Sequence, residues 1–203
     1  VKSSTNYLSF LIPGLLALSL LSSSLFGTGM VIVANRRERL LKHYMTTPMR
    51  KGYYLASHFI GRYLILAVEA AAVLLSSYLF FDFQIHGKFI NVALVTVLGT
   101  ATFTSLAMLC CSRLSNTGAY NSLSNCILVP SVILSGAFFS TSYLPDIVAK
   151  LAHNMPLTVA TDALRKVSIY NYDLSQVWWQ ITVLIGYFIV FSFFSFKLFR
   201  WHN

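Results

Sequence analysis

Five long apolar runs divide this sequence, with short polar stretches between them. A helix needs about 20 residues to cross the hydrocarbon core of a bilayer, and each run reaches that length. Strands of a membrane barrel would instead appear as alternating segments of about 10 residues, a pattern that the runs do not have. The sequence therefore predicts an all-α polytopic membrane protein, with about five transmembrane helices in a single transmembrane domain over residues 1–203. The spans are expected at residues 7–34, 52–80, 89–112, 118–140 and 177–199.

The composition agrees with lipid as the main solvent of the chain. Hydrophobic residues make up 56% of the sequence and charged residues only 10%, whereas a soluble domain carries about 25% charged residues. A soluble fold of this size could not hide so much apolar surface from water. The net charge of +9 does not indicate nucleic-acid binding, because the basic residues flank the apolar runs, as topology alone requires.

The distribution of lysine and arginine predicts the orientation of the chain. The loop at residues 35–51 holds six basic residues and one acidic residue, and short basic loops face the cytoplasm. This placement also puts Arg113 and the C-terminus in the cytoplasm, and the polar segment 141–176 outside. It leaves the N-terminus outside, so we expect that an upstream segment with one more span is missing from this chain.

The basic loop at residues 35–51 has an amphipathic first part. Residues 36–45 can form a short helix with Leu40, Leu41 and Tyr44 on one side, and Pro48 stops it because proline disfavours helix at the residue before it. One interpretation is a topology signal whose helix lies on anionic lipid. The other is a docking helix for a cytoplasmic partner.

Three ionisable residues of the second run fall on one helix face. Arg62 lies four residues after His58 and Glu69 seven residues after Arg62, and charge within a span usually faces protein or water. We interpret them as lining a pathway through the membrane or a dimer seam. Plainer alternatives stay open: Arg62 can extend to the cytoplasmic interface, and Glu69 can pair structurally with Arg62 or with a hydroxyl. A proton relay is a further alternative.

The segment at residues 141–176 contains two short apolar stretches, separated at Asn154–Pro156. Each is too short to span a bilayer. They predict either re-entrant helices, which need protein or water around the broken backbone, or a folded extracellular cap. Trp178, Trp179 and Trp201 flank the last run, as interfacial anchors do.

Two stretches of the sequence resemble the membrane domain of ABC-2-type transporters, the permeases of drug and lipo-oligosaccharide exporters. The first is RERLLKHYMTTP at residues 37–48, which follows an apolar run containing FLIPGLLALSLL. The second is LSGAFFSTSYLP at residues 134–145, followed by NMPLTVATDALR at residues 154–165. Their order and their spacing along the sequence match the family over nearly the whole chain.

The resemblance implies roles for particular residues. In this family, the loop after the second family span is a coupling helix that seats in a cleft of the ATP-binding subunit. The positions that match it are Arg37, Glu38, Arg39, Leu40, Leu41, Lys42, Thr47 and Pro48. The family also has re-entrant helices that close an extracellular gate, which this sequence matches at Gly136, Phe138, Pro145 and Pro156.

The resemblance further implies a permease subunit of an ATP-driven exporter, in the cytoplasmic (inner) membrane of a bacterium. Two permease copies, identical or different, would pair, and two ATP-binding subunits would dock on their coupling loops. The sequence has no G-x-x-x-x-G-K-[ST] phosphate loop and no zinc-protease or serine-hydrolase motif. We therefore expect no catalytic residue, no metal site and no cofactor on this chain, with ATP and Mg²⁺ bound by the partner subunit.

The nature of the spans narrows the substrate. They offer few polar groups to recognise a hydrophilic solute, so we expect an amphipathic or lipid-linked substrate. Two other functions stay open. One is an intramembrane lipid-modifying enzyme, which would have to use His58, Arg62 and Glu69, and the other is a membrane assembly protein that transports nothing.

Overall fold

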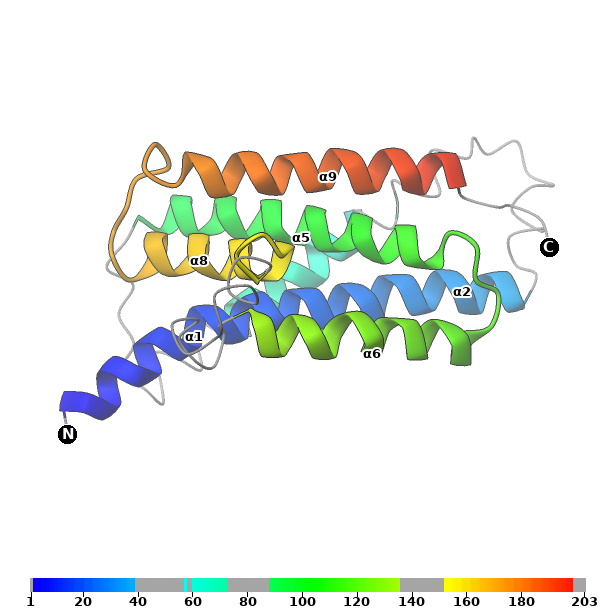
Figure 1. Cartoon of the computed structure of the whole chain (residues 1–203), viewed down its shortest axis with the longest axis horizontal. Helices are drawn as coiled ribbons and strands as arrows, with labels where there is room; N and C mark the ends of the chain where they lie inside the picture. The colour runs from blue at the N-terminus through cyan, green and yellow to red at the C-terminus, as the bar shows by residue number, and fades with distance from the viewer. Residues whose placement is uncertain (1, 39–56, 58–59, 73–87, 136–151, 199–203) are drawn as a thin grey trace.

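The computed structural model describes residues 2–38, 57, 60–72, 88–135 and 152–198, and every regular element in these ranges is helical (Figure 1). The labelled elements are α1 (Lys2–Ser23), η1 (Ser24–Gly29), α2 (Met30–Arg37), α5 (Phe89–Cys111), α6 (Thr117–Leu134), α8 (Pro156–Ser168) and α9 (Trp178–Leu198). Residues 60–72 form a further helix. The prediction of an all-α polytopic membrane protein is confirmed.

Three helices in the described part of the chain are long and apolar enough to cross a membrane. They cover Phe10–Arg37, Phe89–Cys111 and Trp178–Leu198, which correspond to the first, third and fifth apolar runs. The fourth run is helical in α6 as far as Leu134, and the second is helical over residues 60–72. The bounds of the five spans remain predictions.

The helix α5 lies at the centre of the bundle, between α9 on one side and the continuous helix α1–η1–α2 on the other (Figure 1). Its small and hydroxylated residues let neighbouring helices approach closely, as in other membrane bundles. The buried hydroxyls of Thr96, Thr100 and Thr102 bond to the carbonyl oxygens four residues earlier. These bonds let α5 bury polar side chains without unpaired donors at those three positions.

One hydrophobic core joins the central helices. It is built from leucines of α1 and η1, β-branched and aromatic residues of α5, and the buried face of α8. Its largest fully buried members are Leu20, Leu21, Leu25, Phe103, Leu157, Leu164 and Leu184. A smaller cluster, formed by Ile32, Val33, Met108, Cys111 and Tyr120, packs α2 against α5 and α6.

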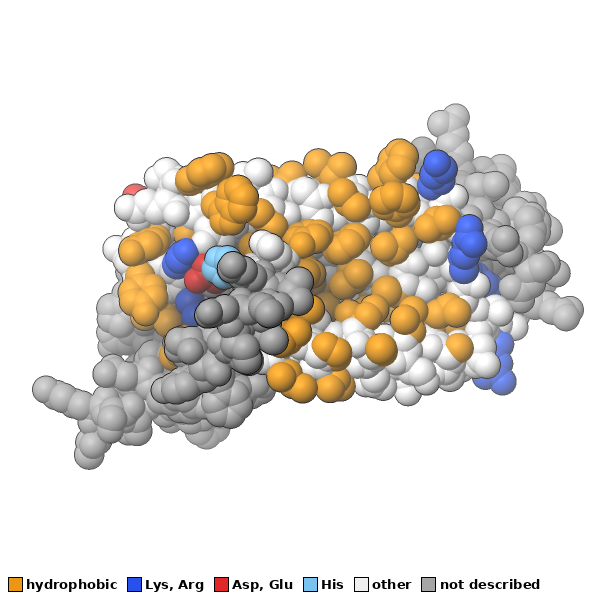
Figure 2. Space-filling model, in the orientation of Figure 1, with side chains coloured by type: hydrophobic (Ala, Val, Ile, Leu, Met, Phe, Trp, Pro, Cys, Tyr) orange, Lys and Arg blue, Asp and Glu red, His pale blue; other side chains and the backbone are white. Residues whose placement is uncertain are grey.

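Charged side chains gather at the two ends of the bundle, and hydrophobic side chains cover the face between them (Figure 2). The ends of α2, α5 and α9 and the start of α6 share one end of the bundle (Figure 1). That end carries Arg36, Arg37, Arg113 and Lys197. The opposite end carries Lys88, Arg165, Lys166, Asp162 and Asp173. Arg113 and the end of α2 lie at the same end of the bundle, which agrees with the prediction that Arg113 and the basic loop lie on the same side of the membrane.

The short helix α8 enters the bundle instead of covering its end. With 13 residues it is about 20 Å long, too short to cross a bilayer. It packs against α1, α5 and α9, and the hydroxyl of Tyr187 donates to the carbonyl oxygen of Asn154, just before α8, at 2.5 Å. Tyr187 lies nine residues after Trp178, the first residue of α9. The start of α8 is therefore level with a point roughly 14 Å from the start of α9. This geometry favours the re-entrant interpretation over an extracellular cap.

Local sequence explains where α8 begins. Pro156 occupies its first turn, where the missing N–H costs nothing. Met155 before it is extended, with ψ 140°, as expected for a residue that precedes proline. Trp178 and Trp179 are exposed at the start of α9, in the position of interfacial anchors, while Trp201 lies outside the described residues.

Candidate functional site: a buried ion pair beside an apolar cleft

An ion pair joins Arg62 and Glu69 within the helix at residues 60–72. The Nη2 atom of Arg62 lies 3.1 Å from Oε2 of Glu69, and the two side chains are 2% and 18% exposed. The pair spans two helical turns, which the length of the arginine side chain allows. Charges inside a membrane bundle are costly unless they are paired and hydrogen-bonded, and this pair meets that condition.

The helix α1–η1 satisfies the remaining donors of Arg62. Its Nη1 atom donates to Oγ of Ser23 at 2.7 Å, its Nε atom to Oγ of Ser24 at 3.3 Å, and its Nη2 atom to the carbonyl oxygen of Leu20 at 3.4 Å. The guanidinium therefore points inward and along the helix toward Glu69. These bonds favour pairing within the bundle over the alternative in which Arg62 extends to the membrane interface.

The structure thus brings together two of the three ionisable residues predicted on this face. The third, His58, lies outside the described residues. The structural pairing of Glu69 with Arg62 is confirmed. A role of this pair in a pathway or dimer seam remains a prediction, because pairing and transport are not exclusive.

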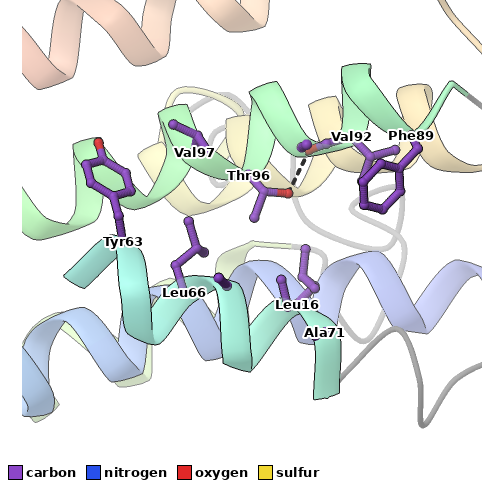
Figure 3. Close-up of a pocket in the computed structure, with 11 residues that line it drawn as sticks. Leu16, Tyr63, Leu66, Ala71, Phe89, Val92, Thr96 and Val97 are labelled. Carbon is purple, nitrogen blue, oxygen red and sulfur yellow. Dashed lines mark hydrogen bonds between the residues drawn. The ribbon is translucent and has the colours of Figure 1, made fainter. Parts of the chain in front are cut away.

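An apolar cleft of about 830 Å³ lies between the helix at residues 60–72 and α5. Figure 3 shows Leu66 and Thr96 extending into the space between the two helices. The hydroxyl of Thr96 bonds to the carbonyl oxygen of Val92 at 2.7 Å, so this wall offers little to a polar ligand. Small side chains leave the space open: the lining includes Ala67, Ala70, Ala71 and Ala93.

The ion pair lies at the margin of this cleft. Leu66 lies between Arg62 and Glu69 on their helix face and also lines the cleft. Leu16 lines the cleft from α1, one turn before Leu20, whose carbonyl oxygen accepts from Arg62. A molecule with an apolar body could occupy the cleft, because the described residues that line it are almost all apolar.

At the end of the bundle that carries the basic loop, Arg36 ties that loop to the connection between α5 and α6. Its Nη1 atom donates to the carbonyl oxygens of Cys111 at 2.9 Å and of Leu114 at 2.7 Å. Carbonyl groups at a helix C-terminus lack intrahelical partners and carry partial negative charge, so a buried guanidinium suits them. The neighbouring Arg37 is exposed, and its Nη1 atom lies 3.4 Å from Oγ1 of Thr117.

The predicted coupling residues are only partly described. Arg37 ends α2 and Glu38 follows as its exposed C-cap residue. The remaining positions, Arg39, Leu40, Leu41, Lys42, Thr47 and Pro48, lie outside the described residues. Of the predicted extracellular gate, Pro156 begins α8, and Gly136, Phe138 and Pro145 also lie outside the described residues.

A π-helical segment beside the ion pair was not predicted from the sequence. The element η1 covers Ser24–Gly29, between α1 and α2. Arg62 contacts its first residue, and Tyr120 of α6 donates its hydroxyl to the carbonyl oxygen of Leu25 at 2.9 Å. Such π-helical turns inside α-helices are frequent at functional sites, and this one is held from two different helices.

The fold is that of a multi-pass membrane protein, and comparison with known proteins gives its family. Residues 1–169 match the ABC-2 type transporter family, and the chain belongs to that family. It is also similar to ABC transporter G family member 20 of Dictyostelium discoideum, with 24% identity over 193 residues. That alignment covers 93% of this chain and 26% of the relative, so the chain spans about a quarter of the relative's length.

Membership of this family makes the chain a permease domain rather than the ATP-hydrolysing part of the transporter. The expected resemblance to ABC-2 transporters is confirmed.

Proposed function

We propose that this chain is the permease subunit of an ATP-driven exporter that moves an amphipathic or lipid-linked substrate outward across the cytoplasmic membrane of a bacterium. Two permease copies, identical or different, form the pathway. Each docks one ATP-binding subunit on residues 36–48, and that subunit binds ATP and Mg²⁺. The end of the bundle that carries Arg37, Arg113 and Lys197 then faces the cytoplasm, together with the C-terminus.

The observation that carries this proposal is the apolar cleft between the helix at residues 60–72 and α5. A volume of about 830 Å³ lies within the range of ligand pockets, roughly 300–1,000 Å³. Its wall is formed by alanine, valine, leucine and aromatic side chains, which suit an alkyl chain and not a sugar or an ion. An amphipathic substrate fits such a cleft because its polar group remains at the membrane surface.

Coupling to ATP hydrolysis needs a rigid path from the docking loop to this cleft. The two bonds of Arg36 join the root of the loop to the C-terminal end of α5. The helix α5 carries one wall of the cleft at the other end of its length. Movement of the docked loop would therefore move α5 and change the width of the cleft.

The ion pair and the start of α8 have roles in the pathway and in its extracellular gate. Glu69 and Arg62, with His58 one turn before Arg62, line the pathway or the dimer seam. Pro156 at the start of α8 belongs to an extracellular gate, together with Gly136, Phe138 and Pro145. The partly buried start of α8, at the level of Tyr187, supports a gate inside the membrane.

The experiment that tests the proposal fills the cleft. The chain and its co-expressed ATP-binding subunit are reconstituted in vesicles that contain a fluorescent phospholipid, and ATP-dependent movement between the leaflets is followed by quenching from outside. Ala70→Leu and Ala93→Leu each add bulk to the cleft wall and should reduce that movement at least tenfold. The matched control, Ala119→Leu, changes an exposed alanine of α6 outside the cleft and should leave movement unchanged. Equal rates in all variants, or inward movement, would contradict the proposal.

A further inference from the structure

A second pocket, of different chemistry, lies at the opposite end of the bundle from the basic loop. It has a volume of about 280 Å³ and forms between Phe10 of α1, Ser135 after α6, and the face of α8 that carries Thr158 and Asp162. This is the end of the bundle where α6 finishes. The pocket therefore lies toward the side that the charge distribution predicts to be outside.

Arg165 is fixed in this pocket. Its guanidinium carbon lies 3.5 Å from the centre of the Phe10 ring, and its Nε atom donates to the carbonyl oxygen of Phe10 at 3.2 Å. Stacking and hydrogen bonding hold the planar group in one orientation. Burial lowers the pKa of Arg165 to about 10, against an opposing effect of the Asp162 charge. Arg165 therefore stays positively charged at neutral pH.

Asp162 is the one carboxylate among the described residues that line this pocket, and it is already engaged. Oδ2 of Asp162 accepts from Nε2 of Gln180 at 2.8 Å and from Nζ of Lys166 at 2.9 Å. Among the described residues that line the pocket, Arg165 and Lys166 together exceed the charge of Asp162 by one. The pocket is therefore suited to an anion.

Thr158 provides an independent observation. It lines the pocket and is 5% exposed, and its buried hydroxyl oxygen has no hydrogen-bond partner in the described part of the chain. A buried hydroxyl without a partner costs free energy. A ligand that supplies an acceptor would remove that cost. Thr158 lies on the same face of α8 as Asp162 and Arg165, because these residues are four and seven positions apart.

The turn after α8 adds hydroxyl donors. The amide of Tyr172 bonds back to the carbonyl oxygen of Lys166 at 3.1 Å, and Asn171 between them adopts a positive φ of 53°, a conformation that asparagine tolerates well. This turn brings Tyr170 and Tyr172 to the lining of the pocket, with their rings 6.1 Å apart.

We propose that this pocket binds a phosphate group, as a monoester or a diester. Guanidinium, ammonium and hydroxyl donors line it from several sides, more than the two oxygens of a carboxylate can use, and phosphate offers more acceptor oxygens in a tetrahedral arrangement. The volume admits a headgroup but not a whole lipid. The phosphate belongs either to a membrane lipid of that leaflet or to a soluble phosphate ester.

The test measures binding directly, so it does not depend on transport activity. The purified chain in a non-ionic maltoside detergent is equilibrated with radiolabelled inorganic phosphate or with a short-chain phosphatidylglycerol, and a diacylglycerol of the same chain length serves as the phosphate-free control. Thr158→Val keeps the shape and removes the unpartnered hydroxyl. It should weaken binding of the phosphate-containing probe about tenfold, while thermal stability without ligand stays equal or rises.

Two further variants keep the result interpretable. Lys166→Gln removes a partly exposed ammonium of the pocket and should weaken binding several-fold. Lys88→Gln removes a cation of the same end that pairs with Asp173 outside the pocket, and it should bind as the wild type does. Binding of the lipid alone identifies a headgroup, binding of inorganic phosphate alone identifies a soluble ester, and binding of both indicates that phosphate itself is recognised. Absence of binding, or equal binding by Thr158→Val and the wild type, would overturn the proposal.

Discussion

The hydroxyl of Tyr120 lies so close to Gly29 that a Cβ atom added at residue 29 would come within 1.7 Å of it. The same hydroxyl donates to the carbonyl oxygen of Leu25. The π-helical turn η1 is thus joined to α6 at a point where only glycine fits. Because Arg62 bonds to Ser24 at the start of the same turn, this segment links three helices beside the ion pair.

Gly29→Ala should displace the Tyr120 ring and destabilise the protein by about 1–3 kcal/mol, the usual cost of overpacking. Gly27→Ala is the matched control in the same turn, because nothing lies within 4 Å of a Cβ there, and it should be neutral. Thermal unfolding in detergent measures both. Removing the ring with Tyr120→Leu should reduce the cost of Gly29→Ala. Equal stability of the two alanine variants would show that the contact is unimportant.

Arg36 and Arg37 are neighbours with the same charge, and the structure predicts different effects for them. Arg36→Gln leaves the carbonyl oxygens of Cys111, at the end of α5, and of Leu114, in the connection to α6, without their charged donor, so it should cost about 1–3 kcal/mol of stability. Arg37→Gln should leave stability nearly unchanged, since Arg37 is exposed, but should weaken binding of the ATP-binding subunit. Both remove one positive charge, so the topology signal falls equally. Comparable loss of stability in the two variants would contradict this assignment.

Glu69→Gln should lower transport while membrane insertion and expression hold. Glutamine keeps an oxygen that can accept from Arg62, and the bonds of Arg62 to Ser23 and Ser24 remain. The charge that lies beside the cleft is lost. The transport assay with fluorescent phospholipid, run beside quantification of folded protein, separates the two effects. A parallel loss of folded protein would show that the pair serves stability alone, and unchanged transport would remove Glu69 from the pathway.

The orientation of the bundle predicts opposite labelling of its two ends. In a background without cysteine, Glu38→Cys lies at the end with the basic loop and Ser175→Cys at the other, and both positions are exposed. An impermeant thiol reagent added to intact cells should label Ser175→Cys alone. Labelling of Glu38→Cys from outside would reverse the orientation and exclude docking of a cytoplasmic ATPase on that loop.

The sequence predicted the fold class because long apolar runs leave few alternatives in a membrane. The start of α8 was also predictable, since Pro156 forces an extended residue before it. Helical periodicity placed Arg62 and Glu69 on one face but gave no sign of Ser23 and Ser24, whose contact depends on the packing of separate helices.

Two features of the site could not be predicted from the sequence. The π-helical turn η1 holds an extra residue, which shifts the side chains after it to another face of the helix. The first apolar run has no alternation of polar and apolar residues, so this shift could not be read from the sequence. Arg36 resembled any basic residue of a cytoplasmic loop, and only the arrival of α5 beside it shows that it binds carbonyl oxygens. The pocket around Arg165 likewise depends on Phe10, which is distant in sequence.

We expect residues 36–48 to dock an ATP-binding subunit and to stimulate it, and the double variant Leu40→Ala with Leu41→Ala removes the apolar pair of that loop. Neither leucine carries charge, so the topology signal is unaffected. Loss of an apolar anchor at an interface commonly costs about 2 kcal/mol or more, roughly 30-fold in affinity. A control pair, Ile189→Ala with Val190→Ala, truncates exposed residues of α9.

The measurement is permease-stimulated ATP hydrolysis by the co-expressed ATP-binding subunit. We expect the Leu40/Leu41 variant to insert at the wild-type level but no longer to retain the subunit or to stimulate hydrolysis, whereas the α9 control should retain the subunit and stimulate hydrolysis. Full stimulation by the Leu40/Leu41 variant would exclude docking through these leucines, and the loop would then serve only as a basic topology signal.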